Sequence, residues 1–599
     1  MLEKELKSIL KDQFGHEQFR LNQLEIITSI LEGNDTLAIM PTGGGKSICY
    51  QIPALYSDGI CLVVSPLISL MHDQVTNLEV NGVKACYLNS SQSFDERKEA
   101  EALILNEEVK LVYVSPEGLL SGYLSHFFDQ VDIALIAIDE AHCVSQWGHE
   151  FRKDYTRLGE LKDLFPKVPL LALTATADSR TRKDIKKQLR MDDPEVFLSS
   201  FDRPNIQYSI CERENEIKQL NDFIEKNHPD DTGIVYCLSR KKVEKTAQEL
   251  NRLGYKAYAY HAGMSSDKRE KVQKIFNTKN RIIIVATIAF GMGIDRPDVR
   301  FVAHLDLPKS IEGYYQETGR AGRDGLPSSA WMVYGLQDVI KLSQMLETTD
   351  ATEAYKKVAK FKLDSMLSLC ETSYCRRKFL LGYFEEELPE DCGNCDACLE
   401  PAETWDGTVD AQKILSVIYK TGEIFGSSYL IDVIRGSKNA KVIERSHDQL
   451  SVYAIGSDKS KSHWNSIIRQ LLNQNYIGIR NWDYRNLYLL EKSREILKGE
   501  VTFMLRKSKE SVRDTKRSKK QLSADHGRDN LFEELRQIRS HLAEEHQIPP
   551  YIVFSDKTLH DMCHLLPQNE DEFLMVNGVG KSKCEKYASV FLGKIQEHL

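Results

Sequence analysis

The chain has 599 residues, of which 41% are apolar and 28% are charged, and its formal net charge is −9 at pH 7. This composition is typical of a soluble globular protein with several domains, and it excludes a membrane-spanning one because no apolar run reaches the length that a bilayer requires. The N-terminal residues 1–7 are charged and amphipathic, unlike a secretory signal, so we expect a cytoplasmic protein, or a nuclear one in a eukaryote. The negative charge does not exclude a nucleic-acid partner, because such binding requires only a local basic track.

The first motif that carries chemistry follows a strand predicted at residues 36–39. Residues 40–47 (MPTGGGKS) predict a nucleotide-triphosphate cradle, because successive glycines let backbone N–H groups turn toward phosphate oxygens. The lysine would neutralise the β- and γ-phosphates and the serine hydroxyl would bind Mg²⁺. The strict pattern begins with glycine where this chain has Met40, so a glycine-rich loop turn is the alternative. The predicted cradle residues are Thr42, Gly43, Gly44, Gly45, Lys46 and Ser47.

A second part of the nucleotide site is predicted further along the chain. The apolar run at residues 133–138 (IALIAI) predicts a parallel strand buried on both faces, and it ends in Asp139 and Glu140. Ligands of open α/β sheets bind at this carboxyl edge. We expect Asp139 to hold Mg²⁺ and Glu140 to orient and deprotonate the attacking water. Two acids after a strand are by themselves an ordinary solvated strand end, but the ordered pair of motifs predicts a Mg²⁺–ATP hydrolase.

A second α/β unit is predicted from residue 207 onward, because further buried strands alternate with helical patterns. It has no cradle, but residues 316–323 (QETGRAGR) place Arg320 and Arg323 three residues apart, on one predicted helical face. We interpret both as charges that reach ATP bound to the first unit, and a solvated basic helix end is the alternative. Two such sheets with ATP between them form a motor whose cleft closes on the nucleotide. The predicted strands span residues 233–237, 282–286 and 300–304, and the predicted helix spans 240–253.

The cysteines predict a metal site. Most are scattered singly, as is typical of reduced thiols, but residues 392–398 (CGNCDAC) hold three at two-residue spacing, which can surround one tetrahedral Zn²⁺. A disulfide cluster does not suit a reducing compartment, and Zn²⁺ is preferred to iron–sulfur because no redox partner is in view. Cys370 and Cys375, both upstream, are candidates for the fourth ligand. The ligands within the motif are Cys392, Cys395 and Cys398.

Beyond residue 406 the pattern changes to short helices followed by a hairpin. Residues 463–472 place apolar side chains on one helical face, and strand-like runs follow at residues 476–480 and 487–490. A helix followed by a hairpin predicts a winged helix. Trp482 or Tyr484 at the hairpin tip could wedge apart a base pair by stacking, and a tip aromatic without a function is the alternative.

The C-terminal part predicts a tether and a small all-α domain. Residues 506–528 are poor in apolar side chains and basic at 516–520, which indicates a solvated linker. Helical spacing follows from Leu531 onward. Gly578 and Gly580 precede the last predicted helix, where backbone N–H groups could bind a phosphate, and an ordinary helix–helix turn is the alternative.

These motifs resemble those of the RecQ family of DNA helicases, bacterial type, within helicase superfamily 2, along nearly the whole chain. The resemblance implies that Gln23, with Arg20 beside it, recognises adenine. It also selects Cys375 as the fourth zinc ligand, because that cysteine precedes two basic residues as in the family motif. The further matching motifs are residues 65–71 (SPLISLM), 173–177 (LTATA), 200–205 (SFDRPN), 260–263 (YHAG) and 286–295 (ATIAFGMGID).

Residues 143–152 (CVSQWGHEFR) resemble the aromatic-rich loop that separates this family from its neighbours. The resemblance implies that Trp147 and Phe151 stack on bases. It also implies that Arg152 binds the charged DNA backbone and that Gln146 belongs to the same DNA-binding loop. Because the loop adjoins the predicted Mg²⁺ carboxylates, it could report DNA occupancy to the hydrolysis site. Packing of the aromatics in a core is the alternative. The chain departs from the family pattern at Lys153, where the family has proline.

The resemblance implies a multidomain α/β protein: RecA-like domains at residues 1–206 and 207–340, a helical zinc-binding module at 341–405, a winged helix at 406–505, a linker at 506–528 and an HRDC domain at 529–599. It implies an ATP-dependent DNA helicase with ATP, Mg²⁺ and one structural Zn²⁺, which moves 3′ to 5′ on single-stranded DNA and opens duplex or forked DNA in recombination, repair, replication and the SOS response.

A single-strand-binding protein at the winged helix is the implied protein partner, the implied location is the nucleoid, and the lack of a sustained heptad predicts a monomer. An RNA helicase and a degenerate ATP-binding DNA clamp are the rival interpretations. The zinc, winged-helix and HRDC-like modules argue against the first. Lys46, Glu140 and the arginines argue against the second.

Overall fold

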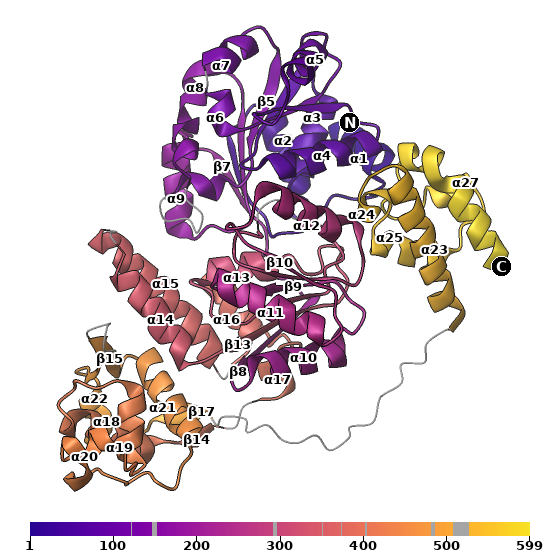
Figure 1. Cartoon of the computed structure of the whole chain (residues 1–599). Coiled ribbons are helices and arrows are strands. Elements are labelled where there is room, and N and C mark those ends of the chain that lie inside the picture. The colour runs from indigo at the N-terminus through magenta and orange to yellow at the C-terminus, as the bar shows by residue number, and fades with distance from the viewer. Residues whose placement is uncertain are drawn as a thin grey trace.

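The computed structural model describes residues 1–120, 122–145, 152–291, 296–349, 352–372, 374–401, 404–480, 486–506 and 526–598. Two α/β lobes are stacked at its centre, a long helical pair extends from the second, and two smaller domains lie at opposite sides (Figure 1). Within these ranges no helix is long and apolar enough to span a bilayer.

Lobe 1 (residues 2–198) contains a seven-stranded sheet in the order β3-β4-β2-β5-β6-β1-β7, and all of its strand pairs are parallel. The apolar run predicted at residues 133–138 is β5 in the middle of this sheet, where helices cover both faces. The elements are β1 (Thr36–Ile39), β2 (Ile60–Val64), β3 (Ala85–Leu88), β4 (Leu111–Val114), β5 (Ile133–Ile138), β6 (Leu170–Thr174), β7 (Glu195–Leu198), α1 (Leu2–Phe14), α2 (Gln23–Leu31), α3 (Ile48–Tyr56), α4 (Ile68–Val80), α5 (Phe94–Leu105), α6 (Pro116–Leu119), α7 (Gly122–Phe128), α8 (Leu161–Leu164), α9 (Ser179–Gln188) and the 3₁₀ segments η1 (Ala141–Val144) and η2 (Lys153–Glu160).

Lobe 2 (residues 206–334) contains a six-stranded parallel sheet in the order β10-β11-β9-β12-β13-β8. Two parallel sheets confirm the predicted fold class. The elements are β8 (Ile206–Glu212), β9 (Gly233–Tyr236), β10 (Ala257–Tyr260), β11 (Ile283–Ala286), β12 (Phe301–His304), β13 (Ser328–Tyr334), α10 (Glu216–Asn227), α11 (Arg240–Arg252), α12 (Ser266–Thr278) and α13 (Ile311–Thr318).

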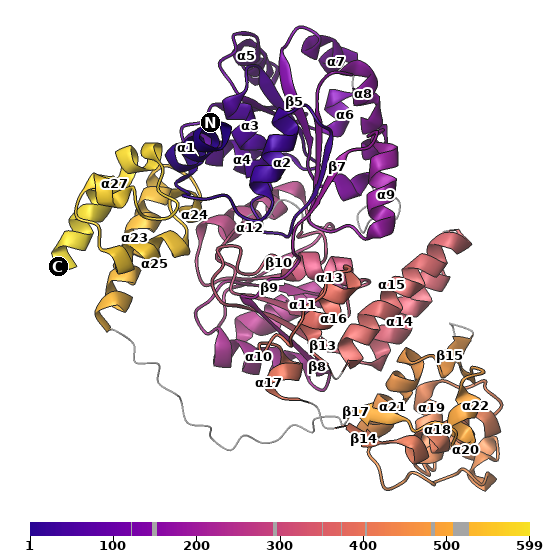
Figure 2. The ribbon, with the colours of Figure 1, turned by 180° about the vertical axis from the view of Figure 1, so that it is seen from behind.

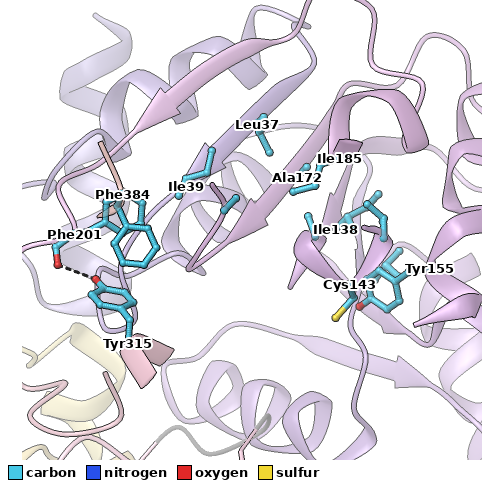
Figure 3. Packing of buried hydrophobic residues seen from close by; sticks show 14 of the residues in the cluster. Leu37, Ile39, Ile138, Cys143, Tyr155, Ala172, Ile185, Phe201, Tyr315 and Phe384 are labelled. Atoms are coloured by element: carbon cyan, nitrogen blue, oxygen red, sulfur yellow. Dashed lines mark hydrogen bonds between the residues drawn. The ribbon is translucent and has the colours of Figure 1, made fainter. Parts of the chain in front are cut away.

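An aromatic cluster joins the lobes to the helical module that follows. Phe201, between the lobes, stacks on Phe384 with ring centroids 4.6 Å apart, and the Tyr315 hydroxyl donates to the Phe201 carbonyl at 2.9 Å (Figure 3). These rings belong to one buried cluster that continues into lobe 1 through Ile39 and Ile138. The connection between the lobes is therefore packed into a core and is not a solvated linker.

The zinc module (residues 336–399) begins with a helical pair and carries the winged helix on its surface. Arg469 of the winged helix pairs with Glu371 of this module and with Glu212 at the end of β8. Its elements are α14 (Leu336–Glu347), α15 (Glu353–Glu371), α16 (Arg376–Tyr383) and α17 (Asp396–Leu399).

The winged helix (residues 404–506) has the predicted helix and hairpin. On one face of the helix Lys461–Asn473, the side chains that the spacing predicts are buried: Trp464, Ile467, Ile468 and Leu471. Its elements are β14 (Thr404–Asp406), α18 (Thr408–Lys420), α19 (Ser427–Ile434), α20 (Ala440–Glu444), η3 (His447–Gln449), α21 (Lys461–Asn473), β15 (Ile477–Arg480), β16 (Asn486–Leu489), α22 (Ser493–Leu497) and β17 (Met504–Arg506). β14 pairs with β17 and β15 with β16, both antiparallel.

The C-terminal helical domain (residues 526–598) docks against α1 and α4 of lobe 1 (Figure 2). Gly578 N donates to the Gly15 carbonyl at 2.9 Å, and Ser582 Oγ donates to the Val80 carbonyl at 3.1 Å. The glycine turn before the last helix is therefore used as a contact between domains here. The elements are α23 (His526–Glu545), α24 (Pro550–Val553), α25 (Asp556–Leu565), α26 (Glu570–Phe573) and α27 (Lys581–His598).

Replacement of Gly15 by alanine tests this docking. Gly15 has φ +68°, and a Cβ there would lie 2.4 Å from Val579 N, whereas Gly33 has φ +87° with no atom within 4 Å of its Cβ position. Both Gly15→Ala and Gly33→Ala should lose about 1–2 kcal/mol of stability from left-handed strain. Only Gly15→Ala should also release the C-terminal domain, which small-angle scattering would detect as a larger radius of gyration. Equal scattering from the two variants would contradict the docked arrangement.

Candidate nucleotide and metal sites

The predicted cradle lies between β1 and α3, at the carboxyl edge of the sheet of lobe 1. Gly43 and Gly45 have φ +81° and +77°, a region that side chains disfavour, so both positions require glycine. Met40 stands where the strict pattern has its first glycine. Its side chain is fully buried, with its sulfur 3.6 Å from Cys49 Sγ. Its carbonyl accepts a hydrogen bond from Lys46 Nζ at 3.4 Å. The departure from the strict pattern therefore packs the core beneath the cradle, and the Met40 N–H donates to the Thr174 carbonyl of β6 at 3.0 Å.

Gln23, the predicted adenine reader, contacts the cradle directly. Its Oε1 accepts from the Arg20 backbone N–H at 2.8 Å, and its Nε2 donates to the carbonyls of Gly45 at 2.9 Å and Gly44 at 3.3 Å. Gln23 is 4% exposed, whereas the Arg20 side chain is exposed. The amide that would recognise a base is thus hydrogen-bonded to the phosphate loop in this structure.

The two predicted carboxylates follow β5 at the same edge. Burial, together with the charge of Glu140, raises the pKa of the Asp139 carboxyl to about 7, against the opposing charge of Lys46. Glu140 has φ +51°, an uncommon conformation for a residue with a side chain, and its N–H donates to Asp139 Oδ1 at 2.9 Å. Tyr155 fixes the turn from behind by donating to the Asp139 carbonyl at 3.1 Å. A partly buried carboxylate that faces a lysine and a phosphate cradle fits a hard divalent cation such as Mg²⁺.

His142 is a site residue that the sequence reasoning missed. Its ring is fully buried, with Nδ1 2.9 Å from Thr174 Oγ1 and 3.3 Å from Glu140 Oε2. It therefore joins the carboxylate motif to residues 173–177, the motif at the end of β6. Its position in the sequence, two residues after Glu140, is the signal that could have identified it as a site residue.

The two predicted arginines take different positions, and the prediction that they share a helical face is wrong. α13 ends at Thr318, so Arg320 and Arg323 lie in the turn beyond it, where helical periodicity does not apply. The Cα of Arg323 lies 3.3 Å from the position of a Cβ on Gly43, so this arginine lies against the cradle of the other lobe. Arg320 is 4% exposed and donates to the Gly291 carbonyl within lobe 2.

Four cysteines of the zinc module converge on one point. The sulfur atoms of Cys375, Cys392, Cys395 and Cys398 all lie within 4.8 Å of one another, a spacing that suits a tetrahedral Zn²⁺ with thiolate ligands. Backbone N–H groups of Lys378 and Cys392 donate to Cys375 Sγ, at 3.4 and 3.3 Å, which favours a thiolate there. Cys375 is confirmed as the fourth ligand, because Cys370 lies outside the cluster, buried among apolar side chains.

Most of the residues predicted to bind DNA lie outside the described residues: Gln146, Trp147, Phe151 and Tyr484, together with Trp482. Arg152 is described, and its Nη1 donates to the Pro66 carbonyl at 2.8 Å. Its backbone N–H donates to the Cys143 carbonyl at 2.9 Å. Arg152 thus ties the end of the aromatic-rich loop to residues 65–71, another of the predicted motifs.

Comparison with known proteins covers nearly the whole chain. Family models match as DEAD/DEAH box helicase (residues 20–185), helicase conserved C-terminal domain (215–325), RecQ zinc-binding (336–399), RQC domain (401–514) and HRDC domain (528–595). The ATP-dependent DNA helicase RecQ of Haemophilus influenzae is 46% identical, over 99% of this chain and 96% of its own length. The proteins of that name from Pasteurella multocida and Bacillus subtilis are 46% and 39% identical, over 98% and 99% of this chain and 93% and 98% of their own lengths.

Loss of a single zinc ligand should unfold the zinc module. A structural zinc can contribute on the order of 10 kcal/mol to folding, so Cys395→Ala should release the metal and give insoluble or degraded protein. Cys370→Ala is the matched control, because it removes a buried cysteine outside the cluster and should keep the zinc. Metal analysis and soluble yield measure both effects. A soluble, fully active Cys395→Ala protein would contradict the structural role.

Proposed function

Because the chain belongs to the RecQ family and is an ATP-dependent DNA helicase, we propose that it translocates 3′ to 5′ on single-stranded DNA and opens duplex or forked DNA during recombination, repair and replication. Its similarity to bacterial RecQ helicases along nearly its full length supports this proposal. The contact of Arg323 with Gly43 carries it structurally, because the cradle and the arginine belong to different lobes. A site divided in this way makes hydrolysis depend on the closure of the cleft.

We propose the following roles at the nucleotide. The N–H groups of the cradle and Lys46 bind the phosphates, and the N-terminus of α3 points toward the same charge. Asp139 and Ser47 would hold Mg²⁺, which supplies charge neutralisation when bound. Glu140 takes the proton of the attacking water, and His142 holds that carboxylate in place.

The two arginines divide the work on the other lobe. Arg323 stabilises the charge that develops on the transferred phosphoryl group, since it lies against the cradle. Arg320 acts indirectly, because its hydrogen bond to the Gly291 carbonyl holds in place the loop that carries Arg323. Gln23 and Arg20 recognise adenine once the Gln23 amide exchanges the cradle carbonyls for the base.

On the DNA side we propose that Gln146, Trp147, Phe151 and Arg152 contact single-stranded DNA and that Tyr484 acts at the strand junction. The Arg152 hydrogen bonds to the carbonyls of Pro66 and Cys143 support the first part, because they connect the loop to segments beside the carboxylates. Aromatic stacking on bases is typically worth about 1–3 kcal/mol per base. We further propose a monomer at the nucleoid that takes part in the SOS response, with a single-strand-binding protein as partner of the winged helix.

Strand separation with Mg²⁺–ATP tests the proposal, using duplexes that carry a 3′ or a 5′ single-stranded tail. The wild type should open only the 3′-tailed duplex. Lys46→Ala should open neither, because it removes the phosphate charge, and Lys84→Ala, at an exposed lysine of lobe 1, should behave as the wild type.

The other outcomes are equally informative. Opening of only the 5′-tailed duplex would reverse the direction. Hydrolysis stimulated by DNA without opening of either tail would indicate a translocase or remodeller. Stimulation by RNA and not by DNA would favour an RNA helicase, and binding without any hydrolysis would favour a degenerate clamp.

A further inference from the structure

The segment that joins the lobes carries an arginine whose side chain lies inside the protein. Arg203 is 9% exposed. Its Nη1 donates to the carbonyls of Thr42 at 2.5 Å and Gly319 at 3.2 Å. Its Nη2 donates to the carbonyls of Ala321 at 3.0 Å and Gly322 at 2.9 Å. Both terminal nitrogens therefore use both of their hydrogens.

The acceptors of Arg203 belong to both halves of the nucleotide site. Thr42 is part of the cradle in lobe 1, and residues 319–322 belong to the turn in lobe 2 that carries Arg320 and Arg323. The two backbones approach closely here, since a Cβ on Gly319 would lie 3.2 Å from Thr42 Cβ. A single planar group thus spans the cleft, and its full set of hydrogen bonds can form only while the lobes are closed.

The zinc module fixes the segment that carries Arg203. Arg377 lies two positions after the ligand Cys375 and is 5% exposed. Its Nη2 donates to the Ile206 carbonyl at 2.8 Å and to the Pro204 carbonyl at 3.3 Å. Its Nε lies 3.3 Å from Asp202 Oδ1. The residues on both sides of Arg203 are therefore held by one side chain of the zinc module.

Two further contacts come from the same module. Asn394, between the ligands Cys392 and Cys395, donates through Nδ2 to the Pro204 carbonyl at 3.3 Å. Glu386 accepts from the Phe201 N–H at 2.7 Å. Phe201 is in turn stacked on Phe384 (Figure 3). The backbone around Arg203 is thus anchored to the zinc module at several points, one of which lies between two zinc ligands.

We propose that Arg203 is a positioning residue for ATP hydrolysis: it aligns the cradle with the turn that carries Arg323, and the zinc module sets its place through the backbone of residues 202–206. The inference deepens the proposed function and needs ATP hydrolysis as its readout. It gives residues 200–205, a motif without an assigned task, a role that acts through Arg323.

Lysine cannot replace this arginine. The guanidinium offers donors in a rigid plane that reaches acceptors on two sides, whereas an ammonium offers three donors from one point. Arg203→Lys keeps the charge and most of the volume but cannot serve Thr42 and the turn together. Hydrogen bonds from charged donors are the stronger kind, so we expect the kcat of DNA-stimulated ATP hydrolysis to fall about tenfold or more.

The closing experiment measures kcat and KM for ATP, nucleotide affinity and zinc content in the full chain. Arg203→Lys should lower kcat, with nucleotide affinity within about threefold of wild type, because the lost bonds form only on closure. Arg213→Lys is the matched control: Arg213 also pairs with a carbonyl and carboxylates, but within lobe 2 and the zinc module, and it should leave kcat unchanged.

A double-mutant cycle separates positioning from a general loss of structure. In an Arg323→Ala background, Arg203→Lys should have little further effect on kcat, because the group that it positions is gone. Arg203→Lys with wild-type kcat would overturn the inference, and so would effects of the two substitutions that multiply independently. Loss of zinc or a large drop in melting temperature on Arg203→Lys would also overturn it, since the defect would then be one of folding. An inactive wild type would instead contradict the proposed function.

Discussion

The nucleotide site is built from two separate sheets, and this division constrains the elements around it. Lys46, Asp139 and Glu140 stand at the edge of one sheet, whereas Arg323 arrives from a turn of the other. Phosphoryl transfer places negative charge between them, and electrostatic stabilisation depends steeply on distance in a dry site. Neither lobe can fix that distance by its own packing. Any group that holds the backbones of the two lobes in a fixed relative position therefore contributes to the chemistry without touching the nucleotide.

The carboxylates at the edge of lobe 1 also depend on a partner outside the lobe's own packing. Asp139 is partly buried beside Glu140, and its pKa is raised to about 7 despite the opposing charge of Lys46, so a bound cation would favour the carboxylate form. The left-handed conformation of Glu140 adds backbone strain that β5 and Tyr155 must hold. A cation bound at this edge of lobe 1 would therefore stabilise the carboxylate form of Asp139.

Much of this arrangement could be predicted from the sequence. The parts that could not be predicted have one cause in common. The strands at residues 36–39 and 133–138 follow from local apolar runs, and the zinc cluster follows from cysteine spacing, although the choice of Cys375 over Cys370 required the family resemblance. Helical spacing predicts one face for Arg320 and Arg323, but α13 ends at Thr318, so that spacing does not apply to them. The hydrogen bonds of Gln23 and Arg203 to cradle carbonyls produce no periodic pattern in the sequence, because their partners lie far away along the chain.

The same inter-lobe segment also connects the site to the winged helix. β8 begins at Ile206, whose carbonyl accepts from Arg377, and ends at Glu212, which pairs with Arg469 of the winged helix. β8 is an edge strand that pairs with β13 along its whole length, so the positions of its two ends are fixed relative to each other. Arg469 also pairs with Glu371 and lies over the Tyr334 ring, 4.9 Å from its centroid, which fixes the winged helix to β13, the neighbour of β8. The winged helix contacts the end of β8 at Glu212, and the zinc module contacts its start at Ile206. Ile206 lies three residues after Arg203, whose hydrogen bonds reach the turn that carries Arg323.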